Sequence, residues 1–163
     1  MNFLTLRCPL PLRIFLTLLL AVFLLPQWLP AQAGMGFRVG ASVDPDQFYF
    51  GGHAGVGPLL EQLWLRPNVE IGIGNDRTLV GLNGEFTYWF PLRNRDWHLY
   101  VGAGPALNII RFDRDRPFGD DTEVEGGFNI LFGLEHRDGL FGELKVGALH
   151  SPEFKIGVGY TFR

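Results

Sequence analysis

The chain has 163 residues, of which 47% are hydrophobic and 19% charged, and its formal net charge is −3 at pH 7. This length suits one domain, and the acidic balance argues against a nucleic-acid partner, because surfaces that bind nucleic acid are strongly basic. Glycine is abundant, with 22 residues, roughly twice its average usage. The glycines follow no collagen-like period and no low-complexity run, so we expect them to have positional roles.

The N-terminal segment has the pattern of a secretory signal peptide. Two arginines precede an apolar run at 14–25, in which Thr17 is the one polar residue, and a small-x-small cleavage motif follows at 31–33. The apolar run is shorter than the ~20 residues that a membrane-spanning helix needs. We therefore predict a signal peptide over residues 1–33, cleaved before Gly34, and one domain over residues 34–163.

Cleavage of this segment would change the cysteine content and the charge of the mature chain. The only cysteine, Cys8, lies in the expected signal peptide, so the mature chain has no thiol for a disulfide or for lipid attachment. Arg7 and Arg13 are lost as well, which leaves 12 basic residues against 17 acidic ones.

The rest of the chain repeats one pattern, in which large apolar residues alternate with small or polar ones. The alternating segments span residues 36–42, 47–57, 64–74, 78–90, 98–110, 123–134, 140–148 and 153–162. Turn-forming residues separate them, and strict period-two alternation is typical of strands with two different faces. No stretch shows sustained helical periodicity. The sequence therefore predicts an all-β fold of eight antiparallel strands.

The two faces of these strands differ sharply. One face is apolar and uncharged; at the end of the chain it comprises Phe154, Ile156, Val158, Tyr160 and Phe162. The other face carries most of the strand glycines together with a set of charged residues: Arg38, Arg66, Glu70, Glu85, Glu125, Glu143, Lys145 and Lys155.

This asymmetry predicts which face is inside. An eight-stranded barrel has an interior just wide enough for its own side chains, so the many large apolar residues would not fit there. With the apolar face in lipid, glycine makes room beside charged side chains in a narrow lumen. Closure is required, since an open sheet edge in lipid leaves backbone groups unsatisfied.

The last strand, "KIGVGYTF", carries a resemblance. Its alternating large apolar residues and terminal aromatics, Tyr160 and Phe162, resemble the C-terminal strand that the barrel-assembly machinery reads in bacterial outer-membrane proteins. With the signal peptide and eight strands, the chain resembles small eight-stranded outer-membrane β-barrels of the OmpA/OmpX-like superfamily. The resemblance implies a closed up-and-down transmembrane barrel in the outer membrane, contact with outer-membrane lipid, and periplasmic termini.

Orientation follows from that resemblance. Connections after odd-numbered strands face outward, including the longest and most charged one at 111–121; further outer loops are expected near 43–46 and 75–77, and at 135–139 if the strand count slips by one. Aromatics near strand ends fit an interfacial girdle. Pro67 and Pro105 lie within expected strands, where each removes a ladder donor, so we expect bulges or strand ends there.

The inward charges allow two interpretations. They could line an ion or proton path, because charged residues inside membranes often mark function. They could instead form a salt-bridged plug. We favour the plug because the positive and negative charges balance and an eight-stranded interior fills with side chains.

Other candidate chemistry is weak. His150, Ser151 and Glu153 supply the residue types of a lipid A deacylase, but adjacent His and Ser side chains on a strand point apart. The four histidines lack metal-ligand spacing, and the aspartates at 113–121 are interleaved with arginines, which could contact lipopolysaccharide phosphates. We predict no catalytic, metal or cofactor site and a structural or interaction role. The alternatives are a soluble periplasmic or secreted barrel that binds an apolar ligand, a lipid A-modifying enzyme, and a narrow channel.

Overall fold

The structure is a computed structural model that describes residues 34–74, 77–92, 96–112 and 122–162. These residues form eight strands: β1 (Gly34–Val43), β2 (Gln47–Leu60), β3 (Leu63–Ile73), β4 (Arg77–Pro91), β5 (Trp97–Phe112), β6 (Thr122–His136), β7 (Leu140–Leu149) and β8 (Phe154–Phe162). Each predicted strand is present, within a few residues of its predicted ends. Across the described ranges, no helix is long and apolar enough to cross a membrane.

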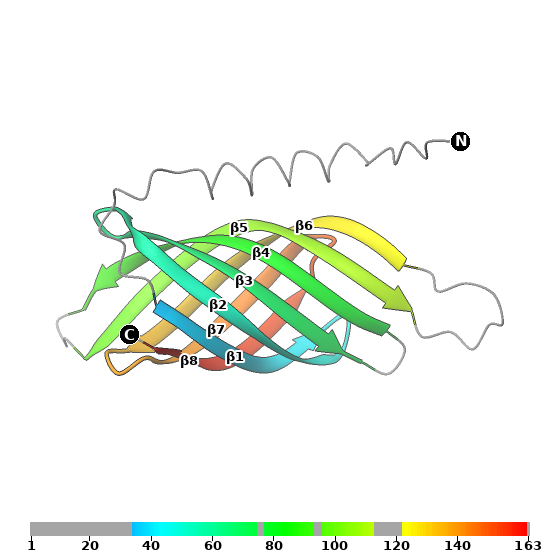
Figure 1. Ribbon diagram of the computed structural model, residues 1–163, viewed down its shortest axis with the longest axis horizontal. Helices are drawn as coiled ribbons and strands as arrows, with labels where there is room; N and C mark the ends of the chain where they lie inside the picture. The colour runs from blue at the N-terminus through cyan, green and yellow to red at the C-terminus, as the bar shows by residue number, and fades with distance from the viewer. Residues whose placement is uncertain (1–33, 75–76, 93–95, 113–121, 163) are drawn as a thin grey trace, which may run out of the picture. The chain divides into compact units, whose positions relative to one another are not determined.

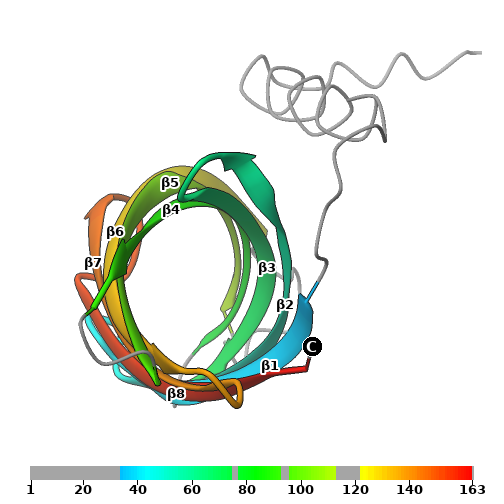
Figure 2. The same ribbon diagram turned by 90° about the vertical axis from the view of Figure 1, so that its left-hand side faces the viewer.

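The eight strands close into one antiparallel barrel (Figures 1 and 2). Each strand pairs with the next in sequence, and β1 pairs with β8 from Met35 opposite Phe162 to Val43 opposite Phe154. Closure gives every strand a partner on both sides, which removes the sheet edges that hydrocarbon would not tolerate. The predicted closed up-and-down barrel is confirmed.

The barrel has two distinct ends. At the terminal end β1 begins and β8 finishes, and β2, β4 and β6 end there; β1, β3, β5 and β7 end at the opposite end, which we call the loop end. The turn at 137–139 belongs to the terminal end, where the Thr161 amide donates to the Gly139 carbonyl at 2.8 Å. Because the strand count is eight, this turn is not one of the outer loops, and the longest connection, 113–121, lies outside the described residues.

Alternation along each strand separates two surfaces as predicted. On β8, for example, Val158 is 55% exposed, while the lumen residue Lys155 of the same strand is 4% exposed. Between the strand ends, the large side chains on the outer surface are aliphatic or aromatic, and most of the buried side chains are polar or charged. This is the inverse of a soluble barrel, in which burial of apolar area drives folding, and it is the pattern of a transmembrane barrel.

The bulges or strand ends predicted at Pro67 and Pro105 are not found. Pro67 pairs with Gly84 of β4 in a register that continues unchanged on both sides, and Pro105 pairs with Phe128 of β6 in the same way. The register shift lies elsewhere, between Val56 and Leu60 of β2. Each proline is therefore inside a regular strand, and the missing amide donor interrupts pairing only with the neighbour on its other side, β2 for Pro67 and β4 for Pro105.

Several outward-facing aromatics lie near the terminal end. Tyr88 lies 5.0 Å from Phe90 between ring centroids, and Tyr160 lies 5.2 Å from Phe162. Phe37 of β1 contacts Phe162 across the strand pair. This placement fits one interfacial girdle.

Candidate functional site

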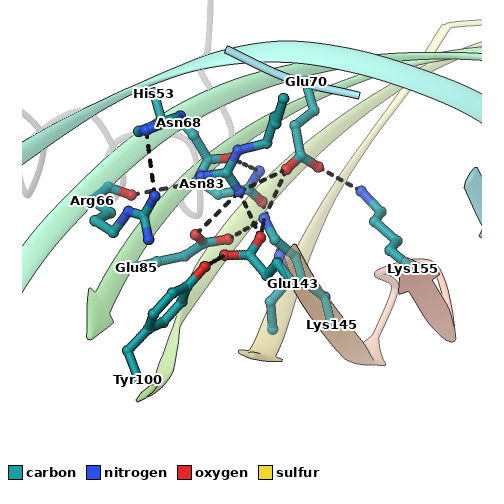
Figure 3. A network of polar contacts seen from close by, with 12 residues as sticks. His53, Arg66, Asn68, Glu70, Asn83, Glu85, Tyr100, Glu143, Lys145 and Lys155 are labelled. Carbon is teal, nitrogen blue, oxygen red and sulfur yellow. Dashed lines mark hydrogen bonds and ion pairs between the residues drawn. The ribbon is translucent and has the colours of Figure 1, made fainter. Parts of the chain in front are cut away.

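Charged side chains from five strands meet inside the barrel. Figure 3 shows acidic and basic residues of β3, β4, β7 and β8 pointing toward one another across the lumen. We call the following set the charge cluster: Arg38, Glu70, Glu85, Glu143, Lys145 and Lys155. Each of these residues occupies an inward position of its strand and is at most 5% exposed.

Short ion pairs hold the charge cluster together. Lys145 Nζ donates to Glu70 Oε1 at 2.7 Å and to Glu85 Oε1 at 2.6 Å. Lys155 Nζ donates to Glu70 Oε2 at 2.8 Å, and Arg38 Nη1 donates to Glu143 Oε1 at 2.8 Å. Three cations thus face three carboxylates, so the cluster is formally neutral, as burial of charge requires.

Neutral polar groups extend this network. The Tyr100 hydroxyl donates to Glu143 Oε2 at 2.9 Å. Three asparagines form a ladder, in which Asn129 donates to Asn83 at 2.9 Å and Asn83 donates to Asn68 at 2.7 Å. Hydrogen-bonded side chains therefore span the lumen around the charge cluster at these positions.

Arg66 lies apart from the charge cluster and is held differently. Its guanidinium carbon is 5.0 Å from the ring centroids of both Tyr100 and Phe141, and Arg66 Nη1 lies 3.7 Å from Glu135 Oε2. Arg66 Nη2 also approaches His53 Nε2 at 3.3 Å. Because a guanidinium can only donate, this His53 nitrogen is the acceptor.

The structure sorts the predicted inward charges into three groups. Six of the eight form the charge cluster, and Arg66 has its own partners. Glu125 is a correction: it is only partly buried near the loop end of β6, and no described basic side chain lies within ion-pair distance of its carboxylate.

Three contributors were missing from the prediction. The predicted sixth strand ends at residue 134 and so excludes Glu135, whereas β6 continues to His136. Tyr100 and Phe141 are 0% and 2% exposed, yet only their alternation with Leu99 and Leu140 marks them as inward. Strict strand phase would have found all three, because inward positions recur every second residue.

The C-terminal assembly residues occupy the outer surface of β8. Phe154, Ile156, Val158 and Phe162 are all exposed there, and Tyr160 is half-buried. Their role in recognition by the assembly machinery stays a prediction.

The other candidates do not assemble into a site. His150 is exposed at the loop end, and Ser151 Oγ accepts a long hydrogen bond of 3.4 Å from Asn108 Nδ2. Among the described residues no three His, Cys, Asp or Glu side chains are grouped as metal ligands. The aspartates and the arginines Arg114 and Arg116 of the 113–121 connection lie outside the described residues; Arg111 is exposed at the end of β5.

Known structures resemble this fold. No protein-family model and no curated protein matches the sequence. The N-terminal β-barrel domain of Pseudomonas aeruginosa OprF is similar at 18% identity and a TM-score of 0.61, over 81% of this chain and 99% of that one. Neisserial surface protein A is similar at 15% identity and a TM-score of 0.60, over 80% and 94% of the two chains.

A third similar structure is PagL, an outer membrane enzyme, at 12% identity and a TM-score of 0.53, over 79% of this chain and 98% of that one. At these identities the likeness concerns architecture alone. The chain has the fold of the small eight-stranded outer-membrane β-barrels.

Proposed function

We propose that this protein is an outer-membrane barrel with a structural or interaction role, whose lumen is closed by the charge cluster and which carries no catalytic site. The observation that supports it most is the set of ion pairs of 2.6 to 2.8 Å that crosses the lumen between β1, β3, β4, β7 and β8. Because these charged side chains are paired with one another, they form no row of unpaired charges along which ions could pass.

The outer surface supports a membrane location. Lipid-facing charge costs about 2–4 kcal/mol for Arg or Lys at the bilayer midplane, and between the strand ends the exposed large side chains are apolar. Lipid is therefore the proposed surrounding partner, and the assembly machinery is the proposed partner during biogenesis. Lipopolysaccharide is proposed as a further contact through the arginines at 111–116.

Cell fractionation tests the location. We expect the mature protein, beginning at Gly34, in the outer-membrane fraction and extractable only by detergent. A soluble monomer in the periplasmic extract would contradict this proposal and favour the soluble barrel that binds an apolar ligand.

Planar-bilayer recording tests the plug. We expect no steady single-barrel openings for the wild type, and little change in conductance for Glu85→Ala, which removes a carboxylate of the charge cluster. Glu125→Ala is the matched control, because that carboxylate lies outside the cluster. Ion-selective openings of the wild type, abolished by Glu85→Ala in a barrel that still folds, would make this protein a channel.

A lipid A analysis tests the enzymatic alternative. Expression of the wild type, and of a variant with His150→Ala and Ser151→Ala, should leave the mass spectrum of lipid A unchanged in both cases. Loss of an acyl chain with the wild type alone would overturn the non-catalytic proposal.

A further inference from the structure

The contact between β1 and β8 differs from every other strand contact of the described barrel, because no turn joins these two strands. All other neighbours are consecutive in the chain and remain tethered when they separate. If the barrel opens at one interface, the β1–β8 seam is the interface at which no connection restrains the opening.

Glycine lines the lumen face of this seam. Across it Gly40 lies opposite Gly157, Gly159 lies opposite Arg38, and Gly36 lies opposite Thr161. The seam itself therefore provides few side chains to hold its two strands together, and the space above each glycine is filled from elsewhere.

Tyr49 of β2 fills the first of these spaces. A methyl group at Gly157 would fall on the Tyr49 hydroxyl, and one at Gly40 would lie 2.8 Å from Tyr49 Cε1. Lys155 of β8 places its Nζ 5.3 Å from the centre of the same ring. The Tyr49 side chain thus crosses β1 and contacts β8, two strands away from its own.

His53, also on β2, fills the space above Gly36 and points toward β8, as Tyr49 does. A methyl group at Gly36 would overlap its imidazole, and the Thr161 hydroxyl oxygen of β8 lies within hydrogen-bond distance of His53 Nε2, at 3.1 Å. This side chain also crosses β1 to reach β8.

Phe141 of β7 crosses the seam from the other side. A methyl group at Gly159 of β8 would overlap the Phe141 ring, and the Arg38 guanidinium carbon of β1 lies 5.7 Å from its centre. Its ring also meets His53 edge-on at 5.3 Å between centroids. Side chains from the two flanking strands therefore meet over the seam.

We propose that Tyr49, His53 and Phe141 form an internal latch over the β1–β8 seam, and that opening of this latched seam is the first step of barrel unfolding. This inference is independent of the role proposed above. Contacts that are lost before the transition state of unfolding control the unfolding rate, so removal of a latch residue should speed unfolding more than removal of an equally buried side chain elsewhere.

Leu131 provides the matched control. It is 1% exposed in the lumen of β6, and its Cδ1 lies 3.2 Å from the position of a methyl group at Gly102 of β5. It thus packs on glycine of a neighbouring strand, as the latch residues do, but away from the seam.

A disulfide across the seam makes the test specific. Val39 and Val158 lie directly opposite on the outer surface of β1 and β8, and opposed residues of antiparallel strands have Cα atoms about 4.5–5.5 Å apart, within the range of a disulfide. The mature chain expected from Gly34 onward has no cysteine of its own, so Val39→Cys with Val158→Cys gives one bridge, which can be reduced.

Unfolding rates are measured in detergent and urea with this bridge reduced and oxidised. Reduced, Tyr49→Ala and Phe141→Ala should each speed unfolding by at least about tenfold. Oxidised, they should unfold nearly as slowly as the oxidised parent, whereas Leu131→Ala should keep its acceleration in both states. If either variant does not fold, Tyr49→Phe and Phe141→Leu are used in its place, with Leu131→Val as control. Equal acceleration of the latch variants in both redox states would overturn the latch.

Discussion

The two faces of the same eight strands have opposite chemistry. The lumen face holds the charge cluster, the asparagine ladder and Arg66, all nearly inaccessible to solvent, whereas the outer face exposes large apolar side chains. In a soluble protein the apolar face would be buried and the charges exposed. Here buried charge is stabilised by neighbouring opposite charges, and in the proposed membrane location the apolar area would be stabilised by hydrocarbon.

Alternation alone therefore does not determine which face is inside. What determines it is whether the inward side chains can satisfy one another. The ion pairs between Lys145, Glu70 and Glu85 are possible because strands distant in sequence bring complementary groups within 2.6 to 2.7 Å. A lumen with unpaired charges would be unstable, since one uncompensated buried charge costs several kcal/mol.

The largest expected effect comes from breaking the charge cluster at Glu70. This carboxylate faces Lys145 at 2.7 Å, Lys155 at 2.8 Å and Arg38 at 3.4 Å, so Glu70→Ala should lower the free energy of unfolding by about 3–5 kcal/mol. Urea titration of the folded barrel in detergent measures it. Glu125→Ala is the control and should stay within about 0.5 kcal/mol of the wild type. Equal losses for the two variants would show that the cluster does not stabilise the lumen.

A charge on the lipid face should have the next largest effect. Val158 lies in the middle of β8 on the outer surface, and Val158→Arg should cost about 2–4 kcal/mol of folding free energy in a lipid bilayer. Val158→Leu at the same position is the control and should be nearly neutral. A neutral Val158→Arg, measured by the same titration in vesicles, would mean that the two faces are assigned wrongly.

Breaking the neutral ladder should cost less than breaking the ion pairs. Asn83→Ala removes the acceptor of Asn129 and the donor to Asn68, and each buried group left unsatisfied costs about 1–3 kcal/mol. Asn83→Ala should therefore lower the unfolding temperature of the compact electrophoretic form less than Glu70→Ala does. Asn129→Ala combined with Asn83→Ala should cost less than the sum of the two single changes. Strict additivity would show that these asparagines are not coupled.

The smallest effect is expected at Arg66. Arg66→Lys keeps the positive charge near Glu135 but loses the planar group that lies 5.0 Å from Tyr100 and Phe141, so it should cost about 0.5–2 kcal/mol. Lys145→Arg tests the opposite exchange, a point charge replaced by a planar one within the charge cluster. A loss for Arg66→Lys as large as that for Glu70→Ala would remove the distinction between the ionic and aromatic ways of burying a cation.

Strand phase made much of this architecture predictable from the sequence. Val158 and Lys155 differ in parity along one short segment, so their opposite faces follow from the pleat alone. The same parity also marks Tyr100 and Glu135 as inward, but it does not show which residues they contact. Pro67 and Pro105 show the limit of local rules, because each stays in register inside a strand where a bulge was expected.

Which side chains pair across the lumen depends on how the strands of the closed barrel are staggered. Arg38 is paired with Glu143, 105 positions away, and Lys155 with Glu70, 85 positions away, and Glu125 has the same local pattern without a described partner. The number of strands, their division into an apolar and a polar face and the excess of glycine on the polar face can all be read from the sequence, because they depend on period-two alternation. Barrel closure determines which charges meet and which rings cover the β1–β8 seam, because it brings together side chains that no local sequence pattern relates.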